Sequence, residues 1–425
     1  MLKNYLLTAW NVFQRRKLFT AINLACIVLT LVVLLVVTAL LQEAFYPSGV
    51  EHRSNRFLQV HMMEATNEKG TAISRSPLGY RVIDKYLKPM PGVEMVATVS
   101  GIEPTAVIMN GASTELNMRH ADAEYWRVMD FKVLAGRVPN EDDVAQGRMV
   151  AVLARSMALK LFGDPAPLNR KLETGGQTFT VIGVVQDAMH LNAYADIWVP
   201  VTAYPNTDFR HRMTGNFFAL LLARSPDDLP AIRAEVHRIA GKMDFAGDPE
   251  FTKGEMWADS KIDMFARTLT GSKDINPDTG VVIPGGKIIG GANLVLGGVM
   301  ILMLLFMLLP ALNLVNLNVG RIMERSTEIG VRKAFGASNN QLAAQLVLEN
   351  VLLCLAGGAI ALVLAAGVLW WMEAAGPIPY LKVGLNLAVF GWGLLITIVF
   401  GVLSGVVPAM KMSRLDPVHA LKGAA

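Results

Sequence analysis

The 425-residue chain has little charge and almost no cysteine, and both shortages narrow the classes of protein to which it can belong. Charged residues make up 17% of the chain and apolar ones 52%, whereas an ordinary soluble domain carries about 25% charged residues. The two cysteines, Cys26 and Cys354, both fall in strongly apolar stretches, and residues 43–287 contain none. A disulfide framework is therefore excluded for that long segment, which must fold around a core of its own.

Sequence motifs for catalysis are also missing. The seven histidines form no H-E-x-x-H or other paired ligand spacing, and no Gly-x-Ser-x-Gly elbow occurs. His61 with Met62 and Met63 offers soft ligands that suit copper, but a strand end with core methionines is the favoured interpretation. The nearest match to a phosphate-binding loop, Gly280 to Lys287, has the wrong glycine spacing, and Ile288 stands where Ser or Thr is needed. We therefore expect no catalytic residue, metal or cofactor in this chain, and if nucleotide energy is used, it must come from another chain.

Long apolar runs are what the sequence has in abundance. Four runs carry no charge: Leu18 to Leu41, Ile288 to Gly320, Val351 to Met372 and Val383 to Met410. About 20 helical residues span a bilayer core of about 30 Å, so each run is long enough. The first run exceeds the roughly 7–15 residues of a cleaved signal sequence, and we interpret it as a retained signal anchor. The sequence predicts an α-helical membrane protein with four transmembrane helices and a large mixed α/β extracytoplasmic domain between the first and second.

Basic residues set the expected orientation. They gather in the first 17 residues, in the connection between the second and third runs, and in the tail: Lys3, Arg15, Arg16, Lys17; Arg321, Arg325, Arg332, Lys333; Lys411, Arg414, Lys422. The connection between the third and fourth runs has only Lys382. Because short cytoplasmic loops are enriched in Lys and Arg, both chain ends and the middle loop are predicted to face the cytoplasm. This asymmetry accounts for the net charge of +4, which therefore gives no support to nucleic-acid binding.

The extracytoplasmic segment shows patterns of both strands and helices. Strands are predicted over Arg56 to Met63, Met149 to Leu153, Thr178 to Val185 and Phe217 to Leu222. Helices are predicted over Leu78 to Lys88, over Ala154 to Phe162 with a stop at Gly163, and from Ser225 to Met243. Residues 271–287 are rich in Gly, Pro, Asp and Asn, which indicates a flexible hinge before the second membrane run.

Few polar residues fall in the four apolar runs, and the centres of the runs contain no ionisable residue. Glu349 lies near the cytoplasmic entry of the third run, where snorkelling or local pairing is expected. Asn313, Asn316 and Asn318 are expected to bond to neighbouring helices. Gly401 and Gly405 have the spacing of closely packed helices. A transporter that couples transport to ions is therefore disfavoured.

The predicted cytoplasmic loop from Glu324 to Ser338 is the most informative stretch. In a helix, Arg321 and Arg325 stack, and so do Glu328 and Arg332, because each pair is four residues apart. Ala334, Phe335 and Ala337 form a compact apolar end. Spacing alone leaves two interpretations open, a solvated helix on the membrane surface and a helix that docks in a partner's groove.

The residues of this loop resemble a known family. ERSTEIGVRKAFGAS is similar to the signature E-R-x-x-E-I-G-(I/V)-R-(K/R)-A-(L/F)-G-A of MacB/FtsX-type ABC transporter permeases, the type VII class. Three further stretches resemble the family in the correct order: LKNYLLTAW before the first run, EYWRVMDFKVLAGRVP to FTVIGVVQD in a MacB-like periplasmic core domain, and the tail from Pro408 to Leu421. Four motifs over nearly the whole chain make the match specific.

The resemblance implies a mechanism called mechanotransmission. In such a complex two permeases pair and dock on a cytoplasmic ABC ATPase dimer, whose ATP cycle moves the external domains. Carried over to this chain, the ATPase-coupling residues would be Glu324, Arg325, Glu328, Ile329, Gly330, Arg332, Lys333, Phe335 and Gly336. The second permease would be the same or a related chain, and a membrane-fusion adaptor and an outer-membrane channel are further partners in some members. No nucleotide-binding domain precedes the first run, so we expect the ATPase to be separate.

These expectations give a domain map and a set of rival functions. The expected parts are a cytoplasmic amphipathic helix (1–17), spans at 18–41, 288–319, 345–372 and 383–410, the periplasmic core domain (42–287), the coupling loop (320–344), a short periplasmic loop (373–382) and a cytoplasmic tail (411–425). The expected function is ATP-driven efflux of a drug, peptide or similar substrate from a bacterial inner membrane. Lipoprotein extraction, or an FtsX-like scaffold that activates a cell-wall hydrolase, stays open as an alternative.

Overall fold

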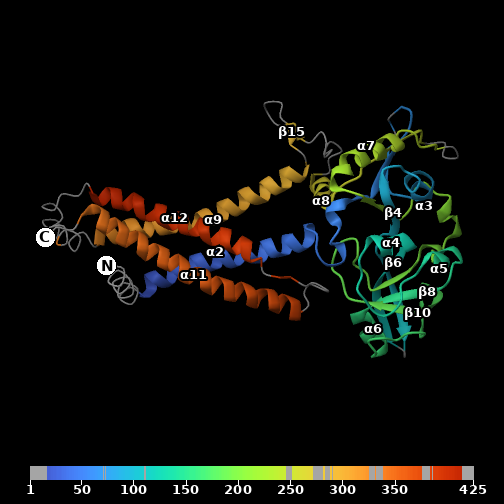
Figure 1. Ribbon diagram of the computed structural model, residues 1–425, viewed down its shortest axis with the longest axis horizontal. Coiled ribbons are helices and arrows are strands. Elements are labelled where there is room, and N and C mark those ends of the chain that lie inside the picture. The colour runs from blue at the N-terminus through green and yellow to red at the C-terminus, as the bar shows by residue number, and fades with distance from the viewer. Residues whose placement is uncertain are drawn as a thin grey trace. The chain divides into compact units, whose positions relative to one another are not determined.

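The chain folds into two compact units, each described by itself (Figure 1). The computed structural model describes residues 17–69, 71, 73–109, 112–245, 251–270, 281–282, 288–289, 291–324, 331, 338–375, 383–384 and 386–413. The helical unit comprises residues 1–42, 297–378 and 382–425, and the α/β unit comprises residues 43–296 and 379–381. The chain passes from one unit to the other inside helix α2 (Lys17–Phe45) and inside helix α9 (Gly291–Glu324).

Long apolar helices dominate the helical unit. Besides α2 and α9 they include α11 (Asn339–Ala375) and α12 (Leu387–Ser413). Their lengths are 29, 34, 37 and 27 residues in chain order. Among the described residues, Thr20–Phe45 and Val347–Ala375 are long and apolar enough to span a membrane, whereas Asn293–Leu308 and Leu387–Leu403 are shorter apolar stretches. Two candidate spans therefore follow from length and composition, and the number four stays a prediction.

Polar caps set the residues at which two helices begin. Helix α11 begins at Asn339, before the predicted span of 345–372, because the Ser338 hydroxyl accepts from Gln341 N (3.3 Å) and the Gln341 side chain accepts from Ser338 N (3.1 Å). Helix α12 begins at Leu387 rather than at 383, because the Asn386 side-chain oxygen accepts from the N–H groups of residues 388 and 389. Apolar runs show where a helix is buried, but caps decide where it starts.

The second predicted span also starts later than expected, and the first ends later. Residues Ile288–Ile289 form strand β15, which pairs antiparallel with β14 (Val281–Val282), so α9 begins only at Gly291. The predicted hinge at 271–287 thus contains half of a short hairpin, and its residues 271–280 and 283–287 lie outside the described part of the chain. Helix α2 continues past Leu41 to Phe45.

Glycines let the helices of this unit approach closely. A β-carbon at Gly357 of α11 would lie 2.7 Å from Ile27 Cγ2 of α2, and one at Gly393 of α12 would lie 2.8 Å from a Leu34 methyl carbon. A β-carbon at Gly401 would lie 3.0 Å from Cys354 Sγ. The close packing predicted at Gly401 is therefore confirmed, in line with the use of small residues between membrane helices.

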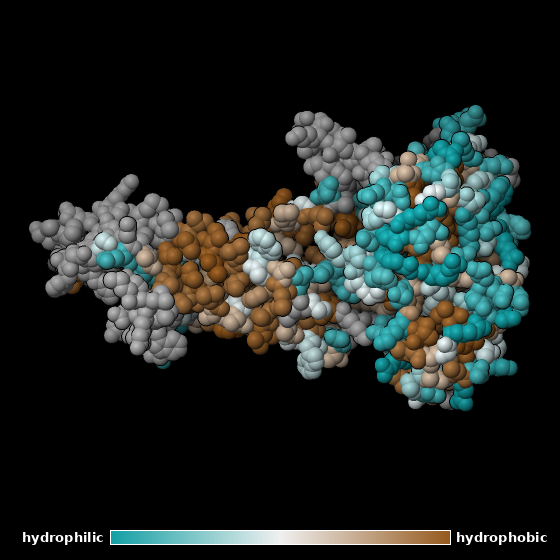
Figure 2. Space-filling model, in the orientation of Figure 1, coloured by the Kyte–Doolittle hydropathy of each residue, from teal (hydrophilic) through white to brown (hydrophobic). Residues whose placement is uncertain are grey.

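On the face that Figure 2 shows, large apolar side chains gather over the helical unit. Leu302 is 67% exposed, Trp370 70% and Trp392 67%. Exposed apolar area of this extent is unfavourable in water and suits a lipid environment. Trp370 lies near the end of α11 and Trp392 near the start of α12, so tryptophans flank the connection between the two helices, as is typical of a membrane–water interface.

The α/β unit is built on a ten-stranded mixed sheet. Its strands are β1 (Phe57–Val60), β4 (Val93–Ser100), β5 (Glu103–Met109), β6 (Ala112–Ala121), β7 (Val133–Gly136), β8 (Val150–Ala154), β9 (Lys171–Thr174), β10 (Gln177–Val185), β11 (Ile197–Pro200) and β12 (Phe217–Ala223). The order is β1-β12-β4-β6-β11-β8-β10-β9-β5, with β7 paired to β10. Strand β5 also pairs with β6, so six strands from β6 to β5 close into a ring.

Two apolar cores lie on this sheet. The first fills the region of the closed ring and α4 (Ala123–Val128), with Trp198, Tyr125 and Phe179 fully buried. The second lies against β1, β12 and β4, where Phe217 and Leu58 are fully buried. Strand β12 is buried at every position, which is the pattern of a strand covered on both faces. Both cores form without a disulfide, as the absence of cysteine from this segment requires.

A small sheet and several helices complete the α/β unit. The three-stranded sheet has the order β13-β2-β3, with β2 (Met62–Thr66), β3 (Ile73–Pro77) and β13 (Lys253–Met256). The helices are α3 (Tyr80–Val82), which continues as a π-helical turn over Ile83–Leu87, α5 (Glu141–Ala145), α6 (Arg155–Phe162), α7 (Leu229–Ala240) and α8 (Lys261–Thr270).

Most predicted elements of this unit are confirmed, and one is wrong. Strand β8 and helix α6 follow one another as expected, and Gly163 caps α6 with φ of 65°. Ser225 forms a capping box before α7. The single strand predicted over Arg56 to Met63 is instead two strands, β1 and β2, separated at His61, because β1 pairs with β12 of the large sheet and β2 with β3 and β13 of the small one.

Candidate functional site

The predicted ATPase-coupling residues follow directly on the end of α9. Helix α9 ends at Glu324 and α11 begins at Asn339, so the segment that connects them is shorter than the predicted 320–344. The other coupling residues lie outside the described part of the chain: Arg325, Glu328, Ile329, Gly330, Arg332, Lys333, Phe335 and Gly336. Their role as the docking helix stays a prediction.

A polar cluster lies inside the helical unit, near the start of α11. Glu349 is 1% exposed and accepts a hydrogen bond from the Gln345 side chain at 3.2 Å. The neighbouring Asn350 is fully buried and donates to the carbonyl oxygen of Gly401 on α12 at 3.1 Å. Snorkelling of Glu349 to the interface is therefore wrong, and local pairing is confirmed. A buried carboxylate is costly unless it is hydrogen-bonded, and the Gln345 amide supplies one such bond.

The same cluster continues one turn further along α11. Cys354 is fully buried and lies 3.6 Å from the carbonyl oxygen of Thr397, while the Thr397 hydroxyl donates to Gly393 O at 2.8 Å. Side chains of Asn313, Asn316 and Asn318 are outside the described set. Helices α11 and α12 are thus joined by hydrogen bonds as well as by packing, which fixes their register.

No metal site emerges from the side chains that the structure describes. In that part of the chain no three His, Cys, Asp or Glu residues gather closely enough to hold an ion. The His61 ring stacks on Phe218 at 4.2 Å, and its Nε2 lies 3.1 Å from the Gln59 side-chain oxygen. Met63 is 1% exposed and packs in the second core, as the favoured interpretation required, whereas Met62 is 40% exposed, so the prediction of core methionines is wrong for Met62.

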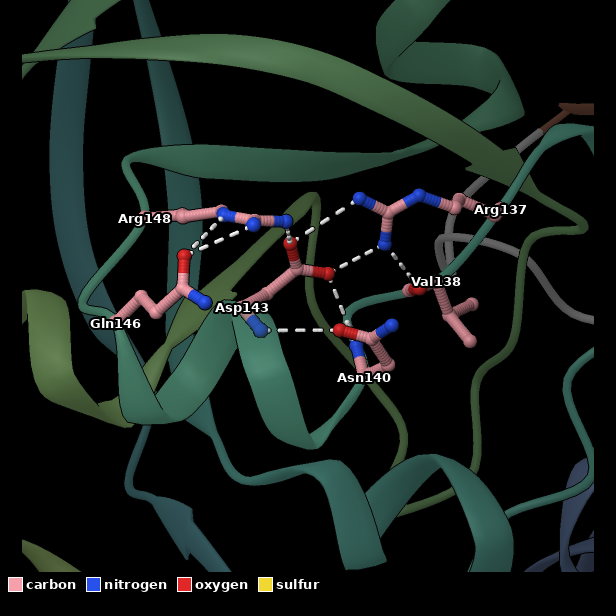
Figure 3. Close-up of polar contacts among 6 residues, drawn as sticks. All are labelled: Arg137, Val138, Asn140, Asp143, Gln146 and Arg148. Atoms are coloured by element: carbon pink, nitrogen blue, oxygen red, sulfur yellow. Dashed lines mark hydrogen bonds and ion pairs between the residues drawn. The ribbon is translucent and has the colours of Figure 1, made fainter.

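In the α/β unit the Asp143 carboxylate is paired with two arginines (Figure 3). Its side chain is fully buried, and Arg137 and Arg148 approach it from two sides, the latter at 3.0 Å. The Asp143 carboxylate also accepts from Asn140 N, while Asp143 N donates to the Asn140 side chain, so the pair forms the capping box of α5. The hydrogen bond from Arg137 lowers the pKa of Asp143 to about 2.

This network fixes one wall of a surface pocket of about 440 Å³. The pocket is lined by Ala123, Trp126, Arg127 and residues 138–142. Arg127 and Glu141 form an exposed ion pair at its rim, 3.1 Å apart. The spacing of Asn140 and Asp143 is a capping-box signal that is visible in the sequence. No sequence pattern predicts that Arg137 and Arg148 pair with Asp143, because this contact depends on the tertiary structure.

Comparisons with known proteins agree on the family. The chain matches the family models "MacB-like periplasmic core domain" over residues 20–239 and "FtsX-like permease C-terminal" over residues 300–417. It is 24% identical over 347 residues to the "Uncharacterized ABC transporter permease YknZ" of Bacillus subtilis, covering 80% of this chain and 77% of that protein.

Longer relatives include proteins named "Macrolide export ATP-binding/permease protein MacB". The protein of Hahella chejuensis is 24% identical over 79% of this chain and 47% of its own length. That of Chromobacterium violaceum is 27% identical over 70% of this chain and 42% of its own length. The chain thus spans about half the length of these MacB relatives.

Two solved structures are also similar to this chain. The extracellular domain of the noncanonic ABC-type transporter YknZ from Gram-positive bacteria has a TM-score of 0.36 and 20% identity, over 46% of this chain and 98% of that one. The periplasmic region of MacB from Actinobacillus actinomycetemcomitans has a TM-score of 0.38 and 17% identity, over 51% of this chain and 94% of that one. The family models together cover most of the sequence, including the stretch between α9 and α11. The chain therefore belongs to the MacB/FtsX-type ABC transporter permeases, membrane proteins that carry a MacB-like periplasmic domain.

Proposed function

We propose that this chain is the permease subunit of an ATP-driven export complex in a bacterial inner membrane. It spans the membrane four times, with both ends in the cytoplasm and the α/β unit in the periplasm. A separate cytoplasmic ABC ATPase dimer binds ATP and Mg, and a second permease completes the transmembrane part. ATP binding and hydrolysis then move the periplasmic domain by mechanotransmission, which drives the efflux of a drug, a peptide or a similar substrate.

The observation that carries this proposal is the place of the coupling motif. The FtsX-like match includes ERSTEIGVRKAFGAS, and this motif connects the ends of two long helices, α9 and α11. Movement of the motif by a partner would reach both helices at once. The polar cluster of Glu349 and Asn350 begins ten residues after the start of α11 and links it to α12, so α12 is coupled to the same motion.

The names of the relatives support efflux, and the poor match to a phosphate-binding loop in this sequence supports a separate ATPase. Several relatives are named for macrolide export, and their names join ATP-binding and permease functions. The nearest match to a phosphate-binding loop in this sequence, Gly280 to Lys287, lacks the required spacing and hydroxyl. We therefore assign ATP hydrolysis to the partner chain, and adaptor and outer-membrane channel to further partners.

The coupling motif can be tested by exchanging one ion pair. In the double variant Glu328→Arg with Arg332→Glu the i,i+4 attraction within a helix remains, while the charges offered to the ATPase are reversed. We expect membrane insertion to be unchanged, and co-purification with the ATPase to fall at least tenfold. Both are measured from the membrane fraction of cells that express the chain with its natural partners.

A matched control lies in the α/β unit. Asp208 and Arg212 form an exposed i,i+4 pair, and its exchange should leave insertion and ATPase binding at wild-type levels. Unchanged ATPase binding in the Glu328/Arg332 variant would overturn the proposed docking role of the motif. Loss of binding in both variants would indicate a general defect in folding and would equally count against it.

A further inference from the structure

A buried ion pair lies where helix α2 enters the α/β unit. Lys261 Nζ and Glu51 Oε2 are 2.5 Å apart, and their side chains are 5% and 0% exposed. The other oxygen of Glu51 accepts from Asn192 N at 3.1 Å. A buried charge is tolerated only with its partner in place, so removal of either residue leaves an uncompensated charge in the domain interior. This pair joins two segments that are 210 residues apart in the chain.

Lys261 also serves the end of α2. Its ammonium group lies 3.5 Å from the carbonyl oxygen of Ala44, in the last turn of that helix. The final carbonyl groups of a helix carry partial negative charge and favour a nearby cation. The last turn of α2 contains no basic residue of its own. Lys261 therefore supplies from α8 the cation that the end of α2 lacks.

The position of Lys261 is unfavourable within its own helix. It is the first residue of α8, where the helix dipole disfavours a cation. The cap of α8 is formed instead by Ser260 and Asp263, which exchange hydrogen bonds between their side chains and backbone N–H groups. Local structure thus gives no reason for a lysine here, whereas the contact with Glu51 and α2 does.

Further contacts fasten the same two elements. Phe45 at the end of α2 and Phe265 of α8 form an edge-to-face ring pair with centroids 5.2 Å apart. Glu43 lies 3.4 Å from His190 Nε2, and the same nitrogen lies 2.9 Å from the Ser48 hydroxyl. The end of α2 is thus fixed by charge, by aromatic packing and by a hydrogen-bonded histidine.

Helix α8 is in turn tied to the sheet. Arg267 forms two hydrogen bonds with the Asp259 carboxylate, at 2.8 and 2.9 Å. The backbone of Asp259 exchanges two hydrogen bonds with that of Gln59 on β1. On the other side, Arg233 of α7 donates to Asp263 at 2.9 Å. A displacement of α8 therefore acts directly on β1 and α7.

We propose that Lys261 and Glu51 are positioning residues that join the end of α2 to α8, so that the two elements move as one body during transport. We call this contact, made by Glu51, Lys261 and Ala44, the α2–α8 joint. The inference rests on the proposed function, because it names how the periplasmic domain receives the motion of a span. Helix α2 carries the chain into the domain, so the joint lies at the place where the motion of the first span would arrive.

The joint is tested by hydrogen exchange on the full chain in complex with its ATPase. In Lys261→Met, amide exchange of residues 43–51 should become at least tenfold faster than in the wild type, because the end of α2 loses its anchor. Lys253→Met, at an exposed position on β13, should leave exchange at wild-type rates. Unchanged exchange of residues 43–51 in Lys261→Met would overturn the joint itself.

Coupling is measured on the same samples with ATP and vanadate as the probe. In the wild type, ATP with vanadate should alter the exchange of residues 261–270; in Lys261→Met this response should fall at least fivefold while ATP hydrolysis continues. A response of wild-type size in Lys261→Met would overturn the coupling role. If the wild-type complex itself gives no response, the proposed function fails. The exchange rates of residues 43–51 without nucleotide would still show whether Lys261 anchors the end of α2.

A cross-link separates loss of the joint from loss of folding. Phe45→Cys with Phe265→Cys, joined by a short thiol-reactive linker in a chain with Cys26→Ser and Cys354→Ala, should restore the nucleotide response of Lys261→Met. Restoration shows that the two elements can move together. If the cross-link abolishes the response in a chain that retains Lys261, α2 and α8 must move apart, and the proposal is wrong.

Discussion

At the scale of single residues, the α/β unit depends on buried polar groups whose charge state is fixed by the fold. Asp143 is kept ionised by Arg137, which lowers its pKa to about 2. His120 is the opposite case: it is fully buried, and burial lowers its pKa to about 4. Neither of its ring nitrogens has a hydrogen-bond partner in the described part of the chain, so the neutral ring is the stable form there.

Neutral His120 makes the stability of the α/β unit dependent on pH. Its pKa is about 6.5 when unfolded and about 4 when folded, so protons favour the unfolded state and stability is lost as the pH falls from about 6.5 to about 4. Between pH 7 and pH 5 the free energy of unfolding falls by about 2 kcal/mol through His120 alone. His120→Gln should reduce the difference in unfolding temperature between these two pH values, measured on the full chain in detergent. His211→Gln, at an exposed site, should not change that difference, and an equal effect of both variants would refute this role of His120.

At the scale of elements, close approaches of backbone decide which strands pair. Gly136 of β7 and Gly183 of β10 lie opposite each other in the antiparallel register. A β-carbon at Gly136, which has φ of +68°, would lie 2.1 Å from Ile182 O, and one at Gly183 would lie 2.1 Å from Arg137 O. Strand β7 pairs only with β10 among the described strands, so this contact fixes its position.

Gly183→Ala should therefore displace β7 and destabilise the α/β unit. The expected loss is about 1–3 kcal/mol, as for other overpacked sites. Gly241→Ala is the matched control, because its β-carbon would meet no atom closer than 3.8 Å, and its effect should stay within about 0.5 kcal/mol. Midpoints of thermal unfolding of the two full-length variants give the comparison. Equal midpoints would show that β7 yields to the added methyl group.

At the scale of the whole molecule, an α/β domain that matches the MacB-like periplasmic core domain is combined with long apolar helices in one permease chain. Chain order places the domain between α2 and α9. The side of the membrane on which each segment lies is a prediction from the basic residues that flank the apolar runs. This orientation and the proposed four spans have consequences that labelling can check.

Single cysteines in a chain with Cys26→Ser and Cys354→Ala would report the two sides of the membrane. Ile108→Cys, at a position 73% exposed on β5, should react with a membrane-impermeant maleimide in intact spheroplasts. Ser338→Cys, at the exposed start of α11, should react only after the membrane is permeabilised, because the coupling motif is expected in the cytoplasm. Labelling of Ser338→Cys from outside would reverse the proposed topology.

The sequence by itself determined the membrane class, the long domain after the first apolar run, the family and most strands and helices. These follow from properties that act locally: apolar runs, residue periodicity and the spacing of a motif such as ERSTEIGVRKAFGAS. Some helix boundaries also carry local signals, as at Asn140 and Ser338, where capping residues stand.

Only the tertiary structure decided which distant residues meet. The division of the expected strand at His61, the burial of Glu349 and the pairing of Lys261 with Glu51 all depend on neighbours far away in the chain. The physical reason is that the sequence gives the chemistry of a charged or amide side chain but not the partner that it meets. The free energy of burying such a group depends on that partner. Hydrophobic periodicity predicts which face of a helix or strand is buried, whereas only the tertiary structure determines which residues pack against that face.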